Sequence, residues 1–159
     1  MSDFVFATSS PRRIELLKKI NLKFKFVPHE FEENNELDID PYELLILNSE
    51  KKSRSILKKY PKDTILASDT VVYKDRVIGK PKNKMEALKI INFLNDSFHT
   101  VMTSIVAINN QGIIFSGVKT SLVITNNIST DKINKYIESE YYADKAGGYG
   151  IQNKNFDFF

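Results

Sequence analysis

The sequence predicts an α/β domain built on a mixed sheet, and three features of the chain support this fold class. Segments with β-strand patterns alternate with segments of helical periodicity, in the order strand, helix, strand, helix, strands, helix, strand pair and helix. The 159 residues suit one compact domain and are too few for two domains with separate cores. Hydrophobic residues make up 42% of the chain, which is enough for an apolar core and argues against general disorder.

The chain is predicted to begin with a strand that leads directly into a helix. Residues 3–8 favour β-structure, and the serines that precede Pro11 are typical of a helix start. An apolar stripe then predicts a helix that stops near Asn21. The stripe consists of Ile14, Leu17 and Ile20. Residues 23–27 alternate as a second strand.

The middle of the chain is predicted to hold a loop, a helix and a hairpin. Residues 29–41 form an acidic loop, and Pro41 opens a helix that reaches about Lys59. Residues 64–67 read as a short apolar strand, and residues 71–78 as a hairpin that turns near Asp75. The buried side of the long helix is expected to contain Leu44, Leu45, Leu47 and Ile56.

The last part of the chain is predicted to contain two helices that flank a pair of long strands. Asn83 caps a helix that runs through Leu94, and residues 100–108 and 113–125 form the strands. Ser129 or Thr130 caps a final helix to about Ser139. Residues 145–150 are too rich in glycine for regular structure, and the phenylalanines at 156, 158 and 159 look like the start of a strand.

The composition excludes several classes of chemistry. The chain has no cysteine, so disulfides, thiolate nucleophiles and cysteine-bound zinc are absent. No apolar run approaches the ~18 residues of a membrane span, and the amino terminus lacks the pattern of a signal peptide. The net charge of +3 comes from interspersed basic and acidic residues, which is weak support for nucleic-acid binding. A cytoplasmic protein without nucleic-acid or membrane partners is the expectation.

The first candidate site is the segment from Ser9 to Arg13, at the junction of the first strand and helix. Free backbone amides and the positive end of a helix dipole lie at such a junction, and the guanidinium groups of Arg12 and Arg13 can bind phosphate oxygens in pairs. The alternative is a helix cap with two exposed arginines.

Asp69 is the second candidate, because it follows an apolar strand and a carboxylate there can hold a divalent metal or take a proton from water. A turn-capping aspartate is the alternative. Lys80 on a tight connection can bind phosphate, although it can equally be a turn residue. Lys51 and Glu33 are by themselves typical of solvated residues, and Gln152 offers an amide for the edge of a base.

Motifs of other nucleotide-binding and metal enzymes are missing. The chain contains no G-x-x-x-x-G-K-[ST] loop, no G-x-G-x-x-G after its first strand and no H-E-x-x-H. P-loop, dinucleotide-binding and zincin interpretations are therefore excluded.

Taken in order, the segments SSPRRIELL, the Glu33 loop, Lys51, SDTVV, GKP, HTVMTSIV and DKAGGYGIQ resemble the Maf family of nucleotide pyrophosphatases. The similarity covers residues 4–152. It implies a mixed, twisted sheet with flanking helices around a central cleft, similar to the fold of inosine triphosphate pyrophosphatases. It also implies a cytoplasmic, possibly homodimeric enzyme that uses Mg²⁺ or Mn²⁺ to hydrolyse nucleoside triphosphates to the monophosphate and pyrophosphate.

The resemblance also implies roles for individual residues. Asp69 matches the general base, and Glu33 and Asp69 match the metal ligands. The branch of the family that acts on dTTP and UTP is similar to this chain at its specificity positions, which implies pyrimidine nucleotides and a housecleaning role. The residues implied to bind substrate are Ser9, Arg12, Arg13, Lys51 and Lys80, and those implied to set specificity are Arg12, Thr70 and Gln152.

Two alternative functions stay open: a 7-methyl-GTP pyrophosphatase, and a nucleotide-binding regulator of cell division without turnover. The family pattern continues past the position of Gln152 through a strand and a further segment, whereas this sequence ends at Phe159. The sequence therefore predicts a single domain over residues 1–159 in which a carboxyl-terminal strand and helix are missing.

Overall fold

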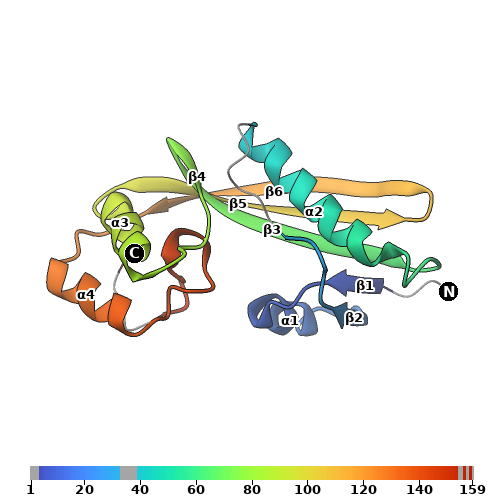
Figure 1. Ribbon diagram of the computed structural model, residues 1–159, viewed down its shortest axis with the longest axis horizontal. Coiled ribbons are helices and arrows are strands. Elements are labelled where there is room, and N and C mark those ends of the chain that lie inside the picture. Colours follow the sequence, from blue (N-terminus) through green and yellow to red (C-terminus); the bar gives the residue numbers. More distant parts are fainter. Residues whose placement is uncertain (1–3, 33–38, 154–155, 157, 159) are drawn as a thin grey trace. The chain divides into compact units, whose positions relative to one another are not determined.

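The computed structural model describes residues 4–32, 39–153, 156 and 158. Along these residues, strands and helices alternate much as the sequence predicts (Figure 1). The elements are β1 (Phe4–Ala7), α1 (Pro11–Lys18), β2 (Phe24–Val27), α2 (Pro41–Leu57), β3 (Thr64–Lys74), β4 (Arg76–Ile78), α3 (Lys84–Leu94), β5 (Phe98–Asn109), β6 (Gly112–Ile124), α4 (Thr130–Glu138) and the 3₁₀ turn η1 (Ala146–Gly148).

The sheet has the strand order β2-β1-β3-β5-β6, and β4 pairs with β3 outside this path. β1 lies parallel to both β2 and β3, whereas β3 and β4 are antiparallel. β5 and β6 are neighbours joined by a two-residue connection, which is the length of an antiparallel hairpin. The expected α/β class with a mixed sheet and accompanying helices is therefore confirmed.

The chain forms two compact units. The first contains Met1–Asp69 and Thr103–Lys119, and the second contains Thr70–Met102 and Thr120–Phe159. Each unit has an apolar cluster of its own. The strands β3, β5 and β6 each contribute residues to both units, and the change of unit in β3 falls between Asp69 and Thr70.

The core of the first unit lies among β1, β3, β5 and the inner side of α2. β1 and β2 are parallel in register from Phe4 opposite Phe24, and these phenylalanine rings lie 6.0 Å apart. Asp40 begins α2 by accepting hydrogen bonds from the two amides that follow Pro41. The fully or nearly fully buried residues of the cluster are Val5, Ala7, Ile56, Ile65, Ala67, Val106 and Ile108. A large aliphatic side chain of this kind contributes about 1.5–3 kcal/mol when it is buried.

The core of the second unit combines the inner faces of α3 and α4 with an aromatic group. Asn83 accepts a 2.9 Å hydrogen bond from the backbone of Glu86 and so caps α3 as predicted. Tyr136 and Phe156 stack with their ring centroids 4.0 Å apart, and Phe158 is fully buried. Phe156 and Phe158 thus belong to the core, and the expected strand start is wrong for these two residues because neither lies in a strand.

Three further local predictions need correction. α1 ends at Lys18 rather than near Asn21, and Ile20 of the predicted stripe is 46% exposed. β3 is one continuous strand of 11 residues, so Asp69 lies in the middle of a strand and not after one. The segment 145–150 contains one regular element, because its alanine and two glycines form η1.

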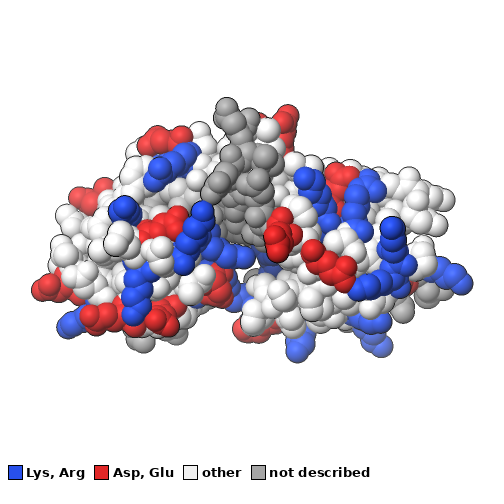
Figure 2. Space-filling model, viewed as in Figure 1, with Lys and Arg blue, Asp and Glu red and all other residues white. Residues whose placement is uncertain are grey.

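The exposed surface mixes charges and apolar residues. On the face drawn in Figure 2, basic and acidic side chains are interspersed rather than gathered by sign. The last strand in the sheet order, β6, exposes large apolar side chains on both of its faces: Ile113, Ile114, Phe115, Leu122 and Ile124. Among the helices of the described ranges, none combines the length and the hydropathy required to cross a bilayer.

Candidate active site

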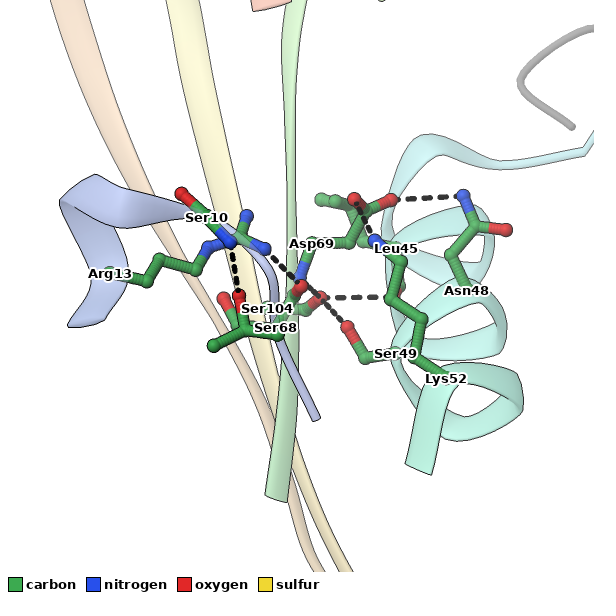
Figure 3. Close-up of polar contacts among 10 residues, drawn as sticks. Ser10, Arg13, Leu45, Asn48, Ser49, Lys52, Ser68, Asp69 and Ser104 are labelled. Atoms are coloured by element: carbon green, nitrogen blue, oxygen red, sulfur yellow. Dashed lines mark hydrogen bonds and ion pairs between the residues drawn. The ribbon is translucent and has the colours of Figure 1, made fainter. Parts of the chain in front are cut away.

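Asp69 is the centre of a buried polar network in the first unit (Figure 3). Its side chain lies on β3 and is only 3% exposed. Lys52 Nζ donates to Oδ1 of Asp69 at 2.7 Å, and Asn48 Nδ2 donates to Oδ2 at 2.9 Å. Because Lys52 is itself 0% exposed, the carboxylate and the ammonium form an ion pair inside the protein.

The helical repeat of α2 explains why two of its residues reach the same carboxylate. Asn48 and Lys52 are four residues apart, so they lie above one another on one face of the helix. Ile56 follows after another four residues and is fully buried. The face that packs against the strands thus carries two polar groups and then an apolar one, and both polar groups are turned toward Asp69 (Figure 3).

A second layer of hydrogen bonds fixes the backbone at Asp69. The hydroxyl of Ser104 on β5 donates to the carbonyl of Leu45 at 2.9 Å and accepts from the backbone amide of Asp69 at 3.4 Å. The Ser49 and Ser104 hydroxyl oxygens are 2.6 Å apart. Since the single proton of Ser104 is used on Leu45, Ser49 is the donor in this pair. Serine at these buried positions therefore links α2, β3 and β5.

The junction of β1 and α1 has the geometry that the sequence predicts. α1 begins at Pro11 with Ser10 as its N-cap residue, although the Ser10 side chain accepts no cap hydrogen bond. Arg13 Nη1 donates to the carbonyl oxygen of Ser68 at 2.7 Å, and Arg13 is half-buried. This contact places one predicted phosphate-binding arginine beside the residue that precedes Asp69. Arg12 is also half-buried, and Ser9 is exposed.

Lys51 and Lys52 are adjacent on α2 but occupy different surroundings. Lys51 is exposed, and its Nζ lies 5.5 Å from the centroid of the Phe31 ring. Lys52, which the sequence reasoning passed over, is the lysine that pairs with Asp69. Glu33, the other predicted acidic ligand, lies outside the described residues.

The remaining predicted site residues belong to the second unit. Thr70 is half-buried in β3, whereas Lys80 and Gln152 are exposed. Lys80 lies at the edge of a cavity of about 530 Å³ between β4 and the start of α3. Three cationic side chains line this cavity together with one carboxylate: Arg76, Lys80, Lys89 and Glu86.

His99 and Tyr149 form a buried neutral pair in the second unit. His99 Nε2 and the Tyr149 hydroxyl are 2.5 Å apart, and the two residues are 2% and 8% exposed. Burial, assisted by the charge of Lys74, lowers the pKa of His99 from 6.5 to about 4. Burial also raises the pKa of Tyr149 well above its ordinary value. Both side chains are therefore uncharged at neutral pH.

The described residues do not by themselves fit a divalent cation. Both carboxylate oxygens of Asp69 already accept hydrogen bonds from nitrogen donors. Within the described ranges, no three acidic, histidine or cysteine side chains come together as a ligand group. A hard cation such as Mg²⁺ requires several oxygen ligands, and the residues described here supply one carboxylate that is already paired.

The match of residues 3–159 to the Maf-like protein family model shows that this chain belongs to that family. Relatives of this chain include proteins named dTTP/UTP pyrophosphatase in three organisms. The relative from Thermosipho melanesiensis is 41% identical, and the aligned region covers 94% of this chain and 80% of the relative. The relative from Acetivibrio thermocellus is 36% identical, with 97% and 81% covered. The relative from Pyrococcus abyssi is 38% identical, with 93% and 78% covered.

Two solved structures are similar in fold. A HAM1 protein from Coxiella burnetii superposes with a TM-score of 0.58 over 99% of this chain and 91% of that chain, at 18% identity. The Ham1 protein of Staphylococcus aureus gives a TM-score of 0.52 over 99% of this chain and 80% of that chain, at 16% identity. At these identities the likeness concerns the fold alone.

The residues that the sequence reasoning missed are those that hold Asp69: Asn48, Ser49, Lys52 and Ser104. For Lys52 a signal was present in the helical spacing. Lys52 comes seven residues after Leu45 and four before Ile56, so it falls on the predicted apolar stripe of α2. Lys51 has the same spacing from Leu44 and Leu47, so the spacing alone does not decide between the two lysines. A lysine on an apolar stripe requires a buried acidic partner, and Asp69 is that partner.

Proposed function

We propose that this chain hydrolyses nucleoside triphosphates, dTTP and UTP in particular, to the nucleoside monophosphate and pyrophosphate. Membership of the Maf-like family and the relatives named dTTP/UTP pyrophosphatase support the activity. The single structural observation that carries the proposal is the buried Asp69 carboxylate with Lys52 and Asn48 on its two oxygens. A charged group maintained in an apolar core is typical of a functional site.

Asp69 is proposed to accept a proton from the attacking water. Each carboxylate oxygen has a second lone pair beyond the one used by Lys52 or Asn48, so the side chain keeps acceptor capacity. The two donors fix the carboxylate in one orientation, and an ordered base loses less entropy when the water is positioned. Lys52 is proposed to take the role that the family resemblance suggests for Lys51, since its ammonium is the one beside Asp69.

Arginine and lysine side chains are proposed to bind the phosphates. Arg13 is anchored by one of its nitrogens to the Ser68 carbonyl, beside the Asp69 carboxylate, and the planar fork of a guanidinium matches the geometry of phosphate oxygens. Such charge-assisted hydrogen bonds contribute about 1.5–3 kcal/mol each. Arg12 and Ser9 at the start of α1 are proposed to join it, and in the second unit Lys80 is proposed to bind phosphate. Thr70 and Gln152 are proposed, with Arg12, to select the base.

A requirement for Mg²⁺ or Mn²⁺, with Glu33 and Asp69 as ligands, is part of the proposal and rests on the family resemblance. A cytoplasmic location, a homodimer and a role in removing non-standard pyrimidine nucleotides are proposed on the same ground.

The proposal is tested by incubating the chain with a panel of nucleotides, with magnesium, with manganese and with a chelator, and measuring monophosphate and pyrophosphate. We expect dTTP and UTP to be cleaved fastest and the chelator to stop the reaction. Cleavage of 7-methyl-GTP above both pyrimidine nucleotides would establish the other specificity. Tight nucleotide binding without any product would instead support a regulatory protein.

Asp69→Asn is the sharpest single variant. General base catalysis usually supplies a factor of about 10² or more, so kcat/KM should fall at least about 100-fold. The matched control is Asp63→Asn, which changes a half-buried acidic residue directly before the same strand, six residues from Asp69. Turnover by Asp69→Asn within tenfold (about 1.4 kcal/mol) of the parent would remove Asp69 from the role of base.

A further inference from the structure

The glycine-rich segment before Gln152 is fixed at three consecutive residues. The backbone amide of Gly147 donates to the carbonyl of Gly79 at 2.9 Å. The hydroxyl of Tyr136 donates to the carbonyl of Gly148 at 2.9 Å, and the hydroxyl of Tyr149 bonds to His99. The three anchors come from the residue after β4, from α4 and from β5, and all lie in the second unit. A segment of this composition is therefore not a free loop.

The path of the segment also depends on the absence of side chains. Gly147 has a φ of 71°, and a Cβ atom at this position would lie 2.7 Å from a methyl carbon of Val72. Gly148 follows with a φ of 70° and is buried. Glycine is the residue that reaches this conformation without strain. The chain is thus brought close to β3 and then turned toward Tyr149.

The Tyr149 ring is enclosed on two sides. It meets the His99 ring edge to face with the centroids 5.4 Å apart, and it meets Phe158 in a similar way at 5.3 Å. His99 Nδ1 is buried and has no hydrogen-bond partner among the described residues. The bond to Tyr149 is consequently the polar contact that the structure records for the His99 ring.

Gln152 is close along the chain to this anchored point. Only Gly150 and Ile151 separate it from Tyr149, and the backbone turns there because the amide of Asn153 donates to the carbonyl of Gly150 at 3.0 Å. Gln152 itself is exposed. The backbone that carries Gln152 therefore leaves directly from the anchored segment.

We propose that His99, Tyr136 and Tyr149 are positioning residues that hold Gln152 in place to contact the base of the nucleotide. This inference rests on the proposed function, in which Gln152 helps to select the base. An amide distinguishes bases through a donor and an acceptor on one side chain, and this works only if its orientation is fixed. Neutral, buried anchors provide that orientation without placing another charge near the base.

The test compares two variants that lose one hydroxyl group each, Tyr149→Phe and Tyr136→Phe, with the control Tyr142→Phe. Tyr142 is buried in the same cluster, but the structure records no hydrogen bond of its hydroxyl among the described residues. For each protein, kcat and KM are measured with dTTP and with GTP. We expect Tyr149→Phe and Tyr136→Phe to reduce the preference for dTTP by about threefold to tenfold each, through KM rather than kcat. Tyr142→Phe should keep the parent preference.

A double-variant experiment separates positioning from general loss of structure. In a Gln152→Ala background, Tyr149→Phe should change the preference no further, because the group it positions has been removed. A purely structural role would lower the active fraction for both nucleotides alike and leave their ratio unchanged. That unchanged ratio, in an active enzyme, would overturn the inference.

Hydrogen exchange provides a readout that does not depend on activity. Amide exchange in residues 147–153 should be faster in Tyr149→Phe and Tyr136→Phe than in the parent and in Tyr142→Phe. If the parent cleaves neither nucleotide, the proposed function is wrong, and the role of Gln152 in contacting the base is wrong with it. Hydrogen exchange would still show in that case whether the tyrosines hold the segment. If exchange is the same in all four proteins, the anchoring itself is disproved.

Discussion

The first unit buries a charged pair, Lys52 and Asp69, whereas the second buries a neutral pair, His99 and Tyr149. Each pair places polar atoms in an apolar core, but the two pairs are disrupted by different changes. A buried ion pair is stable only while both partners are present, because a single charge left in the core is costly. A buried neutral histidine is stable only while it stays unprotonated. We therefore expect the first unit to be destabilised when one partner of its ion pair is replaced, and the second unit to be destabilised when acid protonates His99.

The largest effect on stability should follow from removing one member of the ion pair. Lys52→Met keeps an unbranched side chain, shorter by the charged nitrogen, and leaves Asp69 without its counter-ion, which should lower the free energy of unfolding by about 3–5 kcal/mol. Lys51→Met, on the neighbouring exposed residue, should change it by less than about 0.5 kcal/mol. Chemical denaturation of the two variants measures the difference. The double variant Lys52→Met/Asp69→Asn should regain part of the lost stability, and equal losses in both single lysine variants would refute the comparison.

Acid should act on the second unit through His99. Because the pKa of His99 is lowered from 6.5 to about 4, the unfolded chain takes up this proton at a higher pH than the folded chain does. The stability contribution of neutral His99 is thus present above pH 6.5 and is lost as the pH falls from about 6.5 to about 4. A pKa lowered by about 2.5 corresponds to a loss of at most about 3.4 kcal/mol. Melting curves at several pH values for the parent and for His99→Phe measure it, and the variant should show a flatter dependence.

A smaller effect concerns the backbone. Gly147→Ala in the second unit adds a Cβ atom 2.7 Å from Val72 at a positive φ, which should cost about 1–3 kcal/mol. Gly117→Ala in the first unit is the control, because its nearest contact is the far end of the exposed Phe115 side chain at 3.2 Å. Thermal unfolding of both variants tests this ranking. A Gly117→Ala variant that loses as much stability as Gly147→Ala would contradict the account of the glycine-rich segment.

The smallest expected effect concerns helix caps. Asn83→Ala removes the hydrogen bond from its side chain to the backbone of Glu86 and should cost about 1 kcal/mol. Ser129→Ala, at the start of α4, should cost less because the Ser129 side chain makes no cap hydrogen bond. Equal losses for the two alanine variants would show that the cap geometry is not what stabilises these helix starts.

The order of strands and helices could be predicted because it depends on local signals. Pro11, Pro41 and Asn83 each mark the helix start that the structure shows. The continuity of β3 could not be predicted, since a serine, an aspartate and a threonine in succession are typical of a turn. Asp69 is accommodated in the middle of the strand because Lys52 and Asn48 of α2 donate hydrogen bonds to its carboxylate. These contacts depend on how segments distant in the sequence pack together.

The candidate site was predictable in kind but not in detail. Asp69 and the two arginines were identified from their positions beside a strand and a helix start, and their proposed roles remain to be tested. Lys51 and Lys52 are adjacent in the sequence, so their side chains point about 100° apart around the axis of α2. This difference decides which of the two lysines meets Asp69. The contribution of Ser49 and Ser104 could not be predicted, because a serine in the sequence does not indicate whether it is buried or which group its hydroxyl contacts.

The exposed apolar side chains of β6 have a practical consequence for work with the purified protein. The strand has 13 residues but only one charge, that of Lys119, and β-favouring residues dominate it. Few charges therefore repel a second strand that approaches this edge. We expect the working concentration to be limited by precipitation before it is limited by unfolding. Ammonium sulfate should make this limit more severe, because salts of this kind strengthen contacts between apolar surfaces.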